Sequence, residues 1–167
     1  MSRWRVPLPK GAEPPIRVFV NGVPQAEGRD YQLVGRELLP TYDYLRIYRE
    51  GDVCRVHHDR PSCEHSISLA LDYSDGVAWP IEVERQASNP SSRVDENFGE
   101  SGFASIALEV GDALLYQGVT HRHGRTSANP NGWSAHLFLH WVDAEGPYRD
   151  HAFDRRPRPP QVQFEFA

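Results

Sequence analysis

The segment His57-His58-Asp59 carries side chains that can bind a metal ion. Side chains alternate between the two faces of an extended strand, so residues two positions apart share a face. We therefore expect His57 and Asp59 to converge on one point while His58 faces away. One further imidazole would complete a set of two histidines and one carboxylate, which holds iron and leaves positions open for substrate-side ligands and dioxygen. A lone His-x-Asp is common, however, and the plain alternative is an exposed strand end.

Further along the chain, His121 and His123 are candidates for the missing imidazole. They follow a turn and an apolar strand at 111–116 and a small-residue break at Gly118. The two histidines have the same strand parity, so parity does not choose between them. Arg125 shares this parity, which places a guanidinium on the same face, and a guanidinium pairs with a carboxylate through two parallel hydrogen bonds.

The last predicted strand carries two more histidines on one face, His136 and His140, with Phe138 between them. For each of them a place in the core or in a pocket wall is a simpler interpretation than metal binding. His136 remains a candidate contact to a substrate or cosubstrate. Cys54 and Cys63 lack the Cys-x-x-Cys spacing of a structural zinc site, so we expect free thiols.

The elements that must position these side chains are predicted to be short strands. The 13 glycines and 14 prolines fall between short apolar runs, which is typical of an all-β sandwich or barrel. Strands are expected at 16–20, 44–48, 53–57, 66–71, 77–83, 106–110, 113–116 and 134–142. Asn21-Gly22 indicates a hairpin after the first run. The stretch 29–39 is predicted to be one helix, ended by Pro40.

Three segments fall outside this strand pattern. Residues 1–15 are rich in proline, and residues 154–167 form a tail rich in arginine and proline. The polar stretch 84–102 is long for a loop of a compact domain, so we expect either a lid over the site or a disordered insertion. We see no linker and predict a single domain over residues 1–167, a length typical of one domain.

Composition excludes several classes of protein. The formal net charge of −5 argues against a nucleic-acid or anionic-membrane partner, because such partners need a basic surface. The chain has no apolar run long enough to span a membrane. No apolar stretch follows the first residues, so we expect no secretory signal and a cytoplasmic protein.

Taken in order, several segments resemble the iron(II)- and 2-oxoglutarate-dependent dioxygenases, on their prolyl-hydroxylase-like branch. The resemblance covers about residues 44–147, and it is the order of the motifs that makes it specific, since each motif alone is common. The matching segments are Tyr48-Arg49-Glu50-Gly51, His57 to Glu64, Trp79-Pro80-Ile81, Gly111 to Gly118, His123-Gly124-Arg125 and Phe138 to Asp143.

The resemblance implies an all-β, cupin-like jelly roll, also called a double-stranded β-helix, with one or two short helices. It implies Fe(II) bound by His57, Asp59 and His123, with 2-oxoglutarate and dioxygen as cosubstrates. In this pattern Tyr48 reaches the 2-oxoglutarate, and His121 becomes a neighbour of the metal ligands.

One departure from the family concerns the basic residue that binds the far carboxylate of 2-oxoglutarate. Many members place it about ten residues after the second histidine, where this chain has Trp133. Three alternatives remain: Arg125 takes this part, an arginine of another strand (Arg46 or Arg55) does, or the cosubstrate is not 2-oxoglutarate. A second departure is the short stretch before the core, which leaves little room for the family's flanking helices.

These observations predict an oxygenase that hydroxylates an unactivated C–H bond. Halogenation is disfavoured because the carboxylate position is filled by Asp59. We expect a small-molecule or amino-acid-like substrate rather than a peptide. The rival hypotheses are a cupin-type metalloenzyme that uses the same three ligands without 2-oxoglutarate, and a β-sandwich binding module without catalysis. The substrate, the oxidised position and the oligomeric state are left open.

Overall fold

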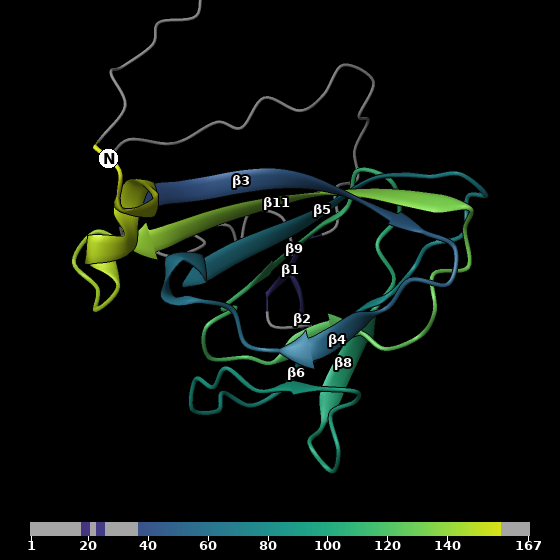
Figure 1. Cartoon of the computed structure of the whole chain (residues 1–167), viewed down its shortest axis with the longest axis horizontal. Coiled ribbons are helices and arrows are strands. Elements are labelled where there is room, and N and C mark those ends of the chain that lie inside the picture. Colours follow the sequence, from purple (N-terminus) through teal and green to yellow (C-terminus); the bar gives the residue numbers. More distant parts are fainter. Residues whose placement is uncertain (1–17, 21–22, 26–36, 158–167) are drawn as a thin grey trace, which may run out of the picture.

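The computed structural model describes residues 18–20, 23–25 and 37–157, and in this part of the chain two β-sheets face each other (Figure 1). The larger sheet contains, in spatial order, β2 (Val23–Gln25), β1 (Val18–Val20), β9 (Ala113–Tyr116), β5 (His65–Tyr73), β11 (Trp133–Asp143) and β3 (Leu38–Arg49). The smaller sheet contains β7 (Val94–Asp95), β4 (Cys54–His57), β10 (His123–Arg125), β6 (Ile81–Glu84) and β8 (Phe103–Ile106). Two short 3₁₀ helices, η1 (Pro61–Cys63) and η2 (Arg149–Arg155), complete the described elements.

The chain alternates between the two sheets as it advances. The larger sheet takes β3, β5, β9 and β11, and the smaller sheet takes β4, β6 and β10 between them. Neighbouring strands are antiparallel, except that β1 runs parallel to β9. This arrangement confirms the predicted all-β, jelly-roll-like fold with short helices. None of the helices in the described part of the chain is long and apolar enough to cross a membrane.

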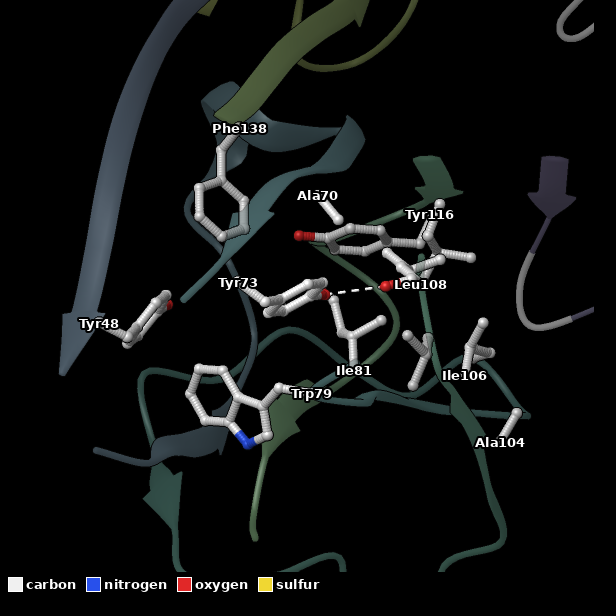
Figure 2. Close-up of a cluster of buried hydrophobic side chains, with 12 residues drawn as sticks. Tyr48, Ala70, Tyr73, Trp79, Ile81, Ala104, Ile106, Leu108, Tyr116 and Phe138 are labelled. Atoms are coloured by element: carbon white, nitrogen blue, oxygen red, sulfur yellow. Dashed lines mark hydrogen bonds between the residues drawn. The ribbon is translucent and has the colours of Figure 1, made fainter. Parts of the chain in front are cut away.

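The core lies between the sheets and is rich in aromatic rings (Figure 2). Tyr48, Trp79, Tyr116 and Phe138 all belong to this buried cluster. Tyr73 also belongs to it, and its hydroxyl donates a hydrogen bond of 2.9 Å to the carbonyl of Leu108. Alternating burial along β11 is the pattern expected of a strand with one face in the core. The inner faces of the two sheets therefore provide the walls around the candidate site.

The helix predicted for residues 29–39 is wrong at its C-terminal end. Leu38 and Leu39 belong to β3, where they pair with Asp143 and Val142 of β11. Pro40 lies inside this strand and does not end a helix. The strand tolerates it because β3 is the last strand of the larger sheet and because the register with β11 shifts between Leu139 and Trp141. The rest of the predicted helix, like the 1–15 segment and the end of the tail, lies outside the described residues.

Two predicted strands are shorter or displaced. β6 begins only at Ile81, because Pro80 lacks an amide hydrogen and cannot donate to a neighbouring strand. The side chain of Trp79, just before it, is fixed by its indole N–H, which donates to the carbonyl of Ser127 at 2.9 Å. β8 ends at Ile106 and does not continue to residue 110. The N-terminal hairpin is confirmed, since β1 and β2 pair antiparallel around residues 21–22.

Candidate metal centre

Two strands of the smaller sheet bring His57 and His123 together. β4 and β10 are antiparallel, and His57 pairs directly with His123, so their ring centroids lie 4.5 Å apart. Asp59 follows β4, and its backbone N–H donates to the carbonyl of Gly118 at 2.8 Å. This bond fixes the chain after the strand and turns the carboxylate toward both rings.

The three side chains present their ligand atoms to a common point. Asp59 Oδ1 lies 3.5 Å from His57 Nε2, and Asp59 Oδ2 lies 3.5 Å from His123 Nε2. All three ligand atoms fall within 4.8 Å of one another. The side chain of His123 is 6% exposed whereas that of His57 is 29% exposed, so the cluster opens to solvent on the His57 side. The close approach that the sequence hypothesis requires is present.

Hydrogen bonds fix the orientation and the tautomer of both rings. His57 Nδ1 lies 2.7 Å from the carbonyl oxygen of Arg55, and His123 Nδ1 lies 3.1 Å from the carbonyl oxygen of His121. A carbonyl only accepts hydrogen bonds, so each Nδ1 carries a hydrogen, and a ring that binds a metal in this tautomer presents the lone pair of Nε2 on the side of Asp59. This is the second partner that metal-binding histidines generally have. Two lone pairs and a carboxylate that face one another fit a cation between them.

The carboxylate of Asp59 is ionised at neutral and mildly acidic pH. Burial acts to raise its pKa, but the charge and hydrogen bond of His123, followed by those of His57, outweigh burial and hold the pKa well below its usual range. An ionised carboxylate with two imidazoles is a donor set suited to a divalent transition metal, iron among them.

Gly118 is the residue that lets Asp59 approach. A Cβ atom at this position would lie 2.9 Å from Asp59 Cγ and 3.0 Å from Asp59 Cβ, and it would clash with Oδ2. Any side chain at residue 118 would therefore displace the carboxylate. The sequence placed Gly118 between a strand and the second histidine, but its contact with Asp59 follows from the fold alone.

Arg125 lies two residues beyond His123 on β10 and is almost completely buried, with 2% exposure. Its guanidinium donates to the carbonyl of Trp79 and lies 4.8 Å from the Trp79 ring centroid. No acidic residue in the described part of the chain pairs with it. Burial acts to lower the pKa of Arg125. A buried guanidinium without a carboxylate is costly, so this position suits an anionic ligand.

His136 stands behind Arg125 and does not line the cavity. Arg125 Nη2 lies 3.3 Å from His136 Nδ1, and because a guanidinium only donates, the ring accepts there. His136 Nε2 then donates to Ser134 Oγ, also at 3.3 Å. His136 therefore contacts Arg125 in this structure, and its contact with a substrate stays a prediction.

One cavity joins the histidines to Arg125. Residues of both sheets line it, namely Tyr44, Arg46, Tyr48, Cys54, His57, Asp59, Ile81, Tyr116, His123, Gly124, Arg125, Phe138 and His140. Tyr48, predicted to reach a cosubstrate, lies in this wall and is buried, and burial raises the pKa of its hydroxyl so that it stays protonated. Its inward position is visible in Figure 2.

The other arginines considered from the sequence differ in placement. Arg46 lines the cavity, is exposed, and stacks over Tyr48 at 4.4 Å from the ring centroid. Arg55 pairs with Glu96 at 3.1 Å, and both side chains are exposed. Arg55 does not line the cavity, so Arg125 and Arg46 remain as the cationic groups of the site.

His121 is near the site through its backbone. Its carbonyl accepts from His123 Nδ1, while its ring Nδ1 lies 3.2 Å from Thr120 Oγ1. The ring is buried but does not line the cavity. The register of β10 against β4 thus selects His123 rather than His121 to face His57, a choice that strand parity left open.

The polar stretch 84–102 is docked on the smaller sheet beside the site. It contains β7, which pairs with β4 so that Val94 lies opposite His57. Arg122 holds the segment at two points, through Glu84 at 2.8 Å and Asp95 at 3.3 Å. Phe98 is buried as well. The segment is therefore anchored to the smaller sheet at several residues, whereas most of residues 85–93 are exposed.

Sequence reasoning assigned no site role to Tyr44 or Cys54, and it named Arg46 only as an alternative to Arg125; all three line the cavity. Tyr44 and Arg46 have the same strand parity as Tyr48, so alternation along β3 could have indicated them. Cys54 gave no comparable signal, because its inward position depends on the pairing of β4 with β10.

Because His136 and His140 are buried, we expect acid to lower the free energy of unfolding. Burial, reinforced by the charge of Arg125, lowers the pKa of His136 to about 3, and burial lowers that of His140 to about 4. Unfolded imidazoles titrate near 6.5, so the unfolded state binds more protons below that pH. We expect the free energy of unfolding of the metal-free protein to fall by up to about 1.4 kcal/mol per pH unit for each histidine as the pH drops below about 6.5.

Urea unfolding between pH 7 and pH 4.5 measures this slope. His140→Gln is expected to reduce it by about the contribution of one histidine. An equal slope in the variant and the wild type would show that His140 is not held neutral in the folded protein.

A comparison with models of protein families gives no match to the chain, and a comparison with curated proteins gives none either.

Proposed function

We propose that this protein is an Fe(II)- and 2-oxoglutarate-dependent oxygenase that hydroxylates an unactivated C–H bond of a small or amino-acid-like molecule. One observation carries the proposal: two imidazoles and an ionised carboxylate share a cavity with a buried guanidinium that has no acidic partner among the described residues. The two imidazoles and the carboxylate suit a metal ion, and the guanidinium suits the carboxylate of a ligand.

The proposed ligands are His57, Asp59 and His123. Three protein ligands leave part of an octahedral coordination sphere free, which favours iron over a closed structural metal. Bound Fe(II) and 2-oxoglutarate would supply the activation of dioxygen, which side chains cannot provide. The carbonyls of Arg55 and His121 would keep both imidazoles in the ligating tautomer.

Arg125 is the proposed partner of the far carboxylate of 2-oxoglutarate. It follows His123 by two residues on the same strand, and such residues are about 6.6 Å apart and share a face. A five-carbon dicarboxylate that chelates the metal at one end can reach a group at that spacing with its other end. His136 would orient the guanidinium, and the Trp79 carbonyl would hold its second nitrogen.

The aromatic walls have the proposed role of excluding water. Tyr48, Tyr116 and Phe138 line the cavity, and each is less than a tenth exposed. A low-dielectric surrounding strengthens the pairing of Arg125 with a carboxylate and protects the reacting groups from solvent. The opening on the His57 side would admit the substrate.

Anaerobic titration and turnover test the proposal. The wild type with Fe(II) is expected to develop a visible absorption band when 2-oxoglutarate is added, and to form succinate under air with ascorbate. His57→Ala and Asp59→Ala are expected to lose both signals. His58→Ala is the matched control, since its Nε2 contacts Ser88 and not the cluster.

The outcomes separate the rival functions. Iron binding without a 2-oxoglutarate band would replace the proposal by a metalloenzyme of another type. A purified protein that takes up no Fe(II) would indicate a binding module.

A further inference from the structure

A second cluster of ligand atoms shares Asp59 with the proposed iron site. Asp59, Cys63 and His140 each offer one ligand atom, and these atoms lie within 4.8 Å of one another. The three residues come from different elements, because Cys63 ends η1 and His140 belongs to β11 of the larger sheet. The fold, rather than a local sequence motif, creates this cluster.

The cluster is buried and contains an unsatisfied nitrogen. Cys63 is 1% exposed and His140 is 4% exposed. His140 Nδ1 lies 2.9 Å from Ser66 Oγ, whereas its Nε2 is buried without a hydrogen-bond partner in the structure. Buried polar atoms without partners are rare in folded proteins, and each such atom calls for an explanation such as an unseen water or ion.

We propose that Asp59, Cys63 and His140 form a second metal site, which takes a thiophilic divalent cation of the Zn²⁺ type. Sulfur, imidazole nitrogen and carboxylate oxygen are the ligands of protein-bound zinc, and three of them leave one of four tetrahedral positions open. Thiolate selects for zinc over the hard cations Mg²⁺ and Ca²⁺. On binding, the Cys63 thiol loses its proton to solvent and the thiolate bonds to the cation.

Neighbouring groups are suitably placed to support such a site. The hydroxyl of Tyr42 lies 3.1 Å from Cys63 Sγ and can donate to the thiolate. The Tyr42 ring also lies 4.6 Å from the His140 ring, centroid to centroid, and restricts its rotation. Ser66 Oγ lies within 3.5 Å of Asp59 Oδ2 as well as next to His140 Nδ1. Outer contacts of this kind orient the direct ligands of metal ions.

Because both sites use Asp59, their occupancies are coupled. A cation between Asp59, Cys63 and His140 neutralises the Asp59 carboxylate that the first site also uses, so it weakens the binding of Fe(II) by His57, Asp59 and His123. This consequence for iron rests on the proposed function, whereas the second site itself does not. The protein would then be inhibited by zinc at the carboxylate that binds its iron.

Titration with Co²⁺, which replaces Zn²⁺ and reports thiolate ligation by a near-ultraviolet charge-transfer band, tests the second site. We expect the band in the wild type, in His57→Ala and in Cys54→Ser, because Cys54 lies in the cavity wall but outside the cluster. Cys63→Ser is expected to abolish the band. His140→Ala is expected to weaken Co²⁺ binding by at least about tenfold, the lower end of what loss of an outer contact costs.

Each result decides the question. Absence of the band in the folded wild type, or its persistence in Cys63→Ser, overturns the proposal. If circular dichroism shows that Cys63→Ser does not fold, two other experiments give the same decision. The first repeats the Co²⁺ titration with Cys63→Ala. The second releases the metal from the wild-type protein with acid and then titrates the thiols with and without Zn²⁺. Failure of iron and 2-oxoglutarate binding in a protein that retains the cobalt band removes the proposed function alone.

Discussion

Arg125→Met is expected to raise the concentration of 2-oxoglutarate required for half-maximal turnover by roughly thirtyfold or more. Loss of one partner from a buried, hydrogen-bonded charge pair costs about 2–5 kcal/mol, and each 1.4 kcal/mol is about a factor of ten in binding. The expectation follows from the depth of Arg125 and from the absence of an acidic partner for it among the described residues. Binding of 2-oxoglutarate to the Fe(II) form, measured by the absorption band, gives the affinity directly.

The same substitution carries a second, opposite expectation for stability. A buried cation without an anion destabilises the unliganded fold, and methionine fills a similar volume without charge. The melting temperature of unliganded Arg125→Met should therefore be no lower than that of the wild type. Function and stability would trade against each other at this residue, as they do at many ligand-binding positions.

Arg46→Met is the matched control for Arg125, because Arg46 lines the same cavity but is exposed. Exposed ion pairs contribute at most about 1 kcal/mol, so the expected change in 2-oxoglutarate affinity is about fivefold or less. Equal effects of the two substitutions would assign the far carboxylate to both arginines. A larger effect of Arg46→Met would transfer that assignment from Arg125 to Arg46.

Gly118→Ala is expected to lower Fe(II) affinity by roughly a hundredfold or more while the fold is kept. The new methyl group would occupy the space of the Asp59 carboxylate, whose Cγ would lie only 2.9 Å away. The carboxylate must then turn from His57 and His123, and the metal loses its only charged ligand in the proposed set. Isothermal titration of the metal-free protein with Fe(II) under anaerobic conditions measures the change.

Gly102→Ala tests whether the effect is specific to the contact with Asp59. No atom lies within 4 Å of the position that a Cβ of residue 102 would occupy, so this variant should bind Fe(II) like the wild type. Circular dichroism distinguishes a local displacement of Asp59 from unfolding. Unchanged Fe(II) binding by Gly118→Ala would mean that Asp59 does not coordinate the metal.

The sequence predicted the approach of His57 to Asp59 for a reason that is only partly right. Alternation of side chains was the argument, but β4 ends at His57 and Asp59 lies beyond the strand. The carboxylate is positioned instead by the backbone hydrogen bond to Gly118. This bond joins segments about sixty positions apart, which local periodicity does not report.

Long-range pairing also explains the other differences from the sequence predictions. The choice between His121 and His123 depends on which of them pairs with His57 across two strands. The leucines at 38 and 39 fit a helical face locally, but pairing with β11 holds them in a strand. Local propensity is a weak prior wherever tertiary contacts compete with it. Strands bounded by clear turns, such as β9 after Gly111-Asp112, were predicted correctly.

Under the proposed function, the two sheets that line the cavity would have different roles. His57, His123 and Arg125 belong to the smaller sheet, whereas Tyr44, Phe138 and His140 project from the larger one. Evolution, or a protein engineer, can vary Tyr44 and Phe138 to admit new molecules and leave the proposed ligands of the smaller sheet unchanged. A library confined to Tyr44 and Phe138 would explore substrate range with the least risk to metal binding.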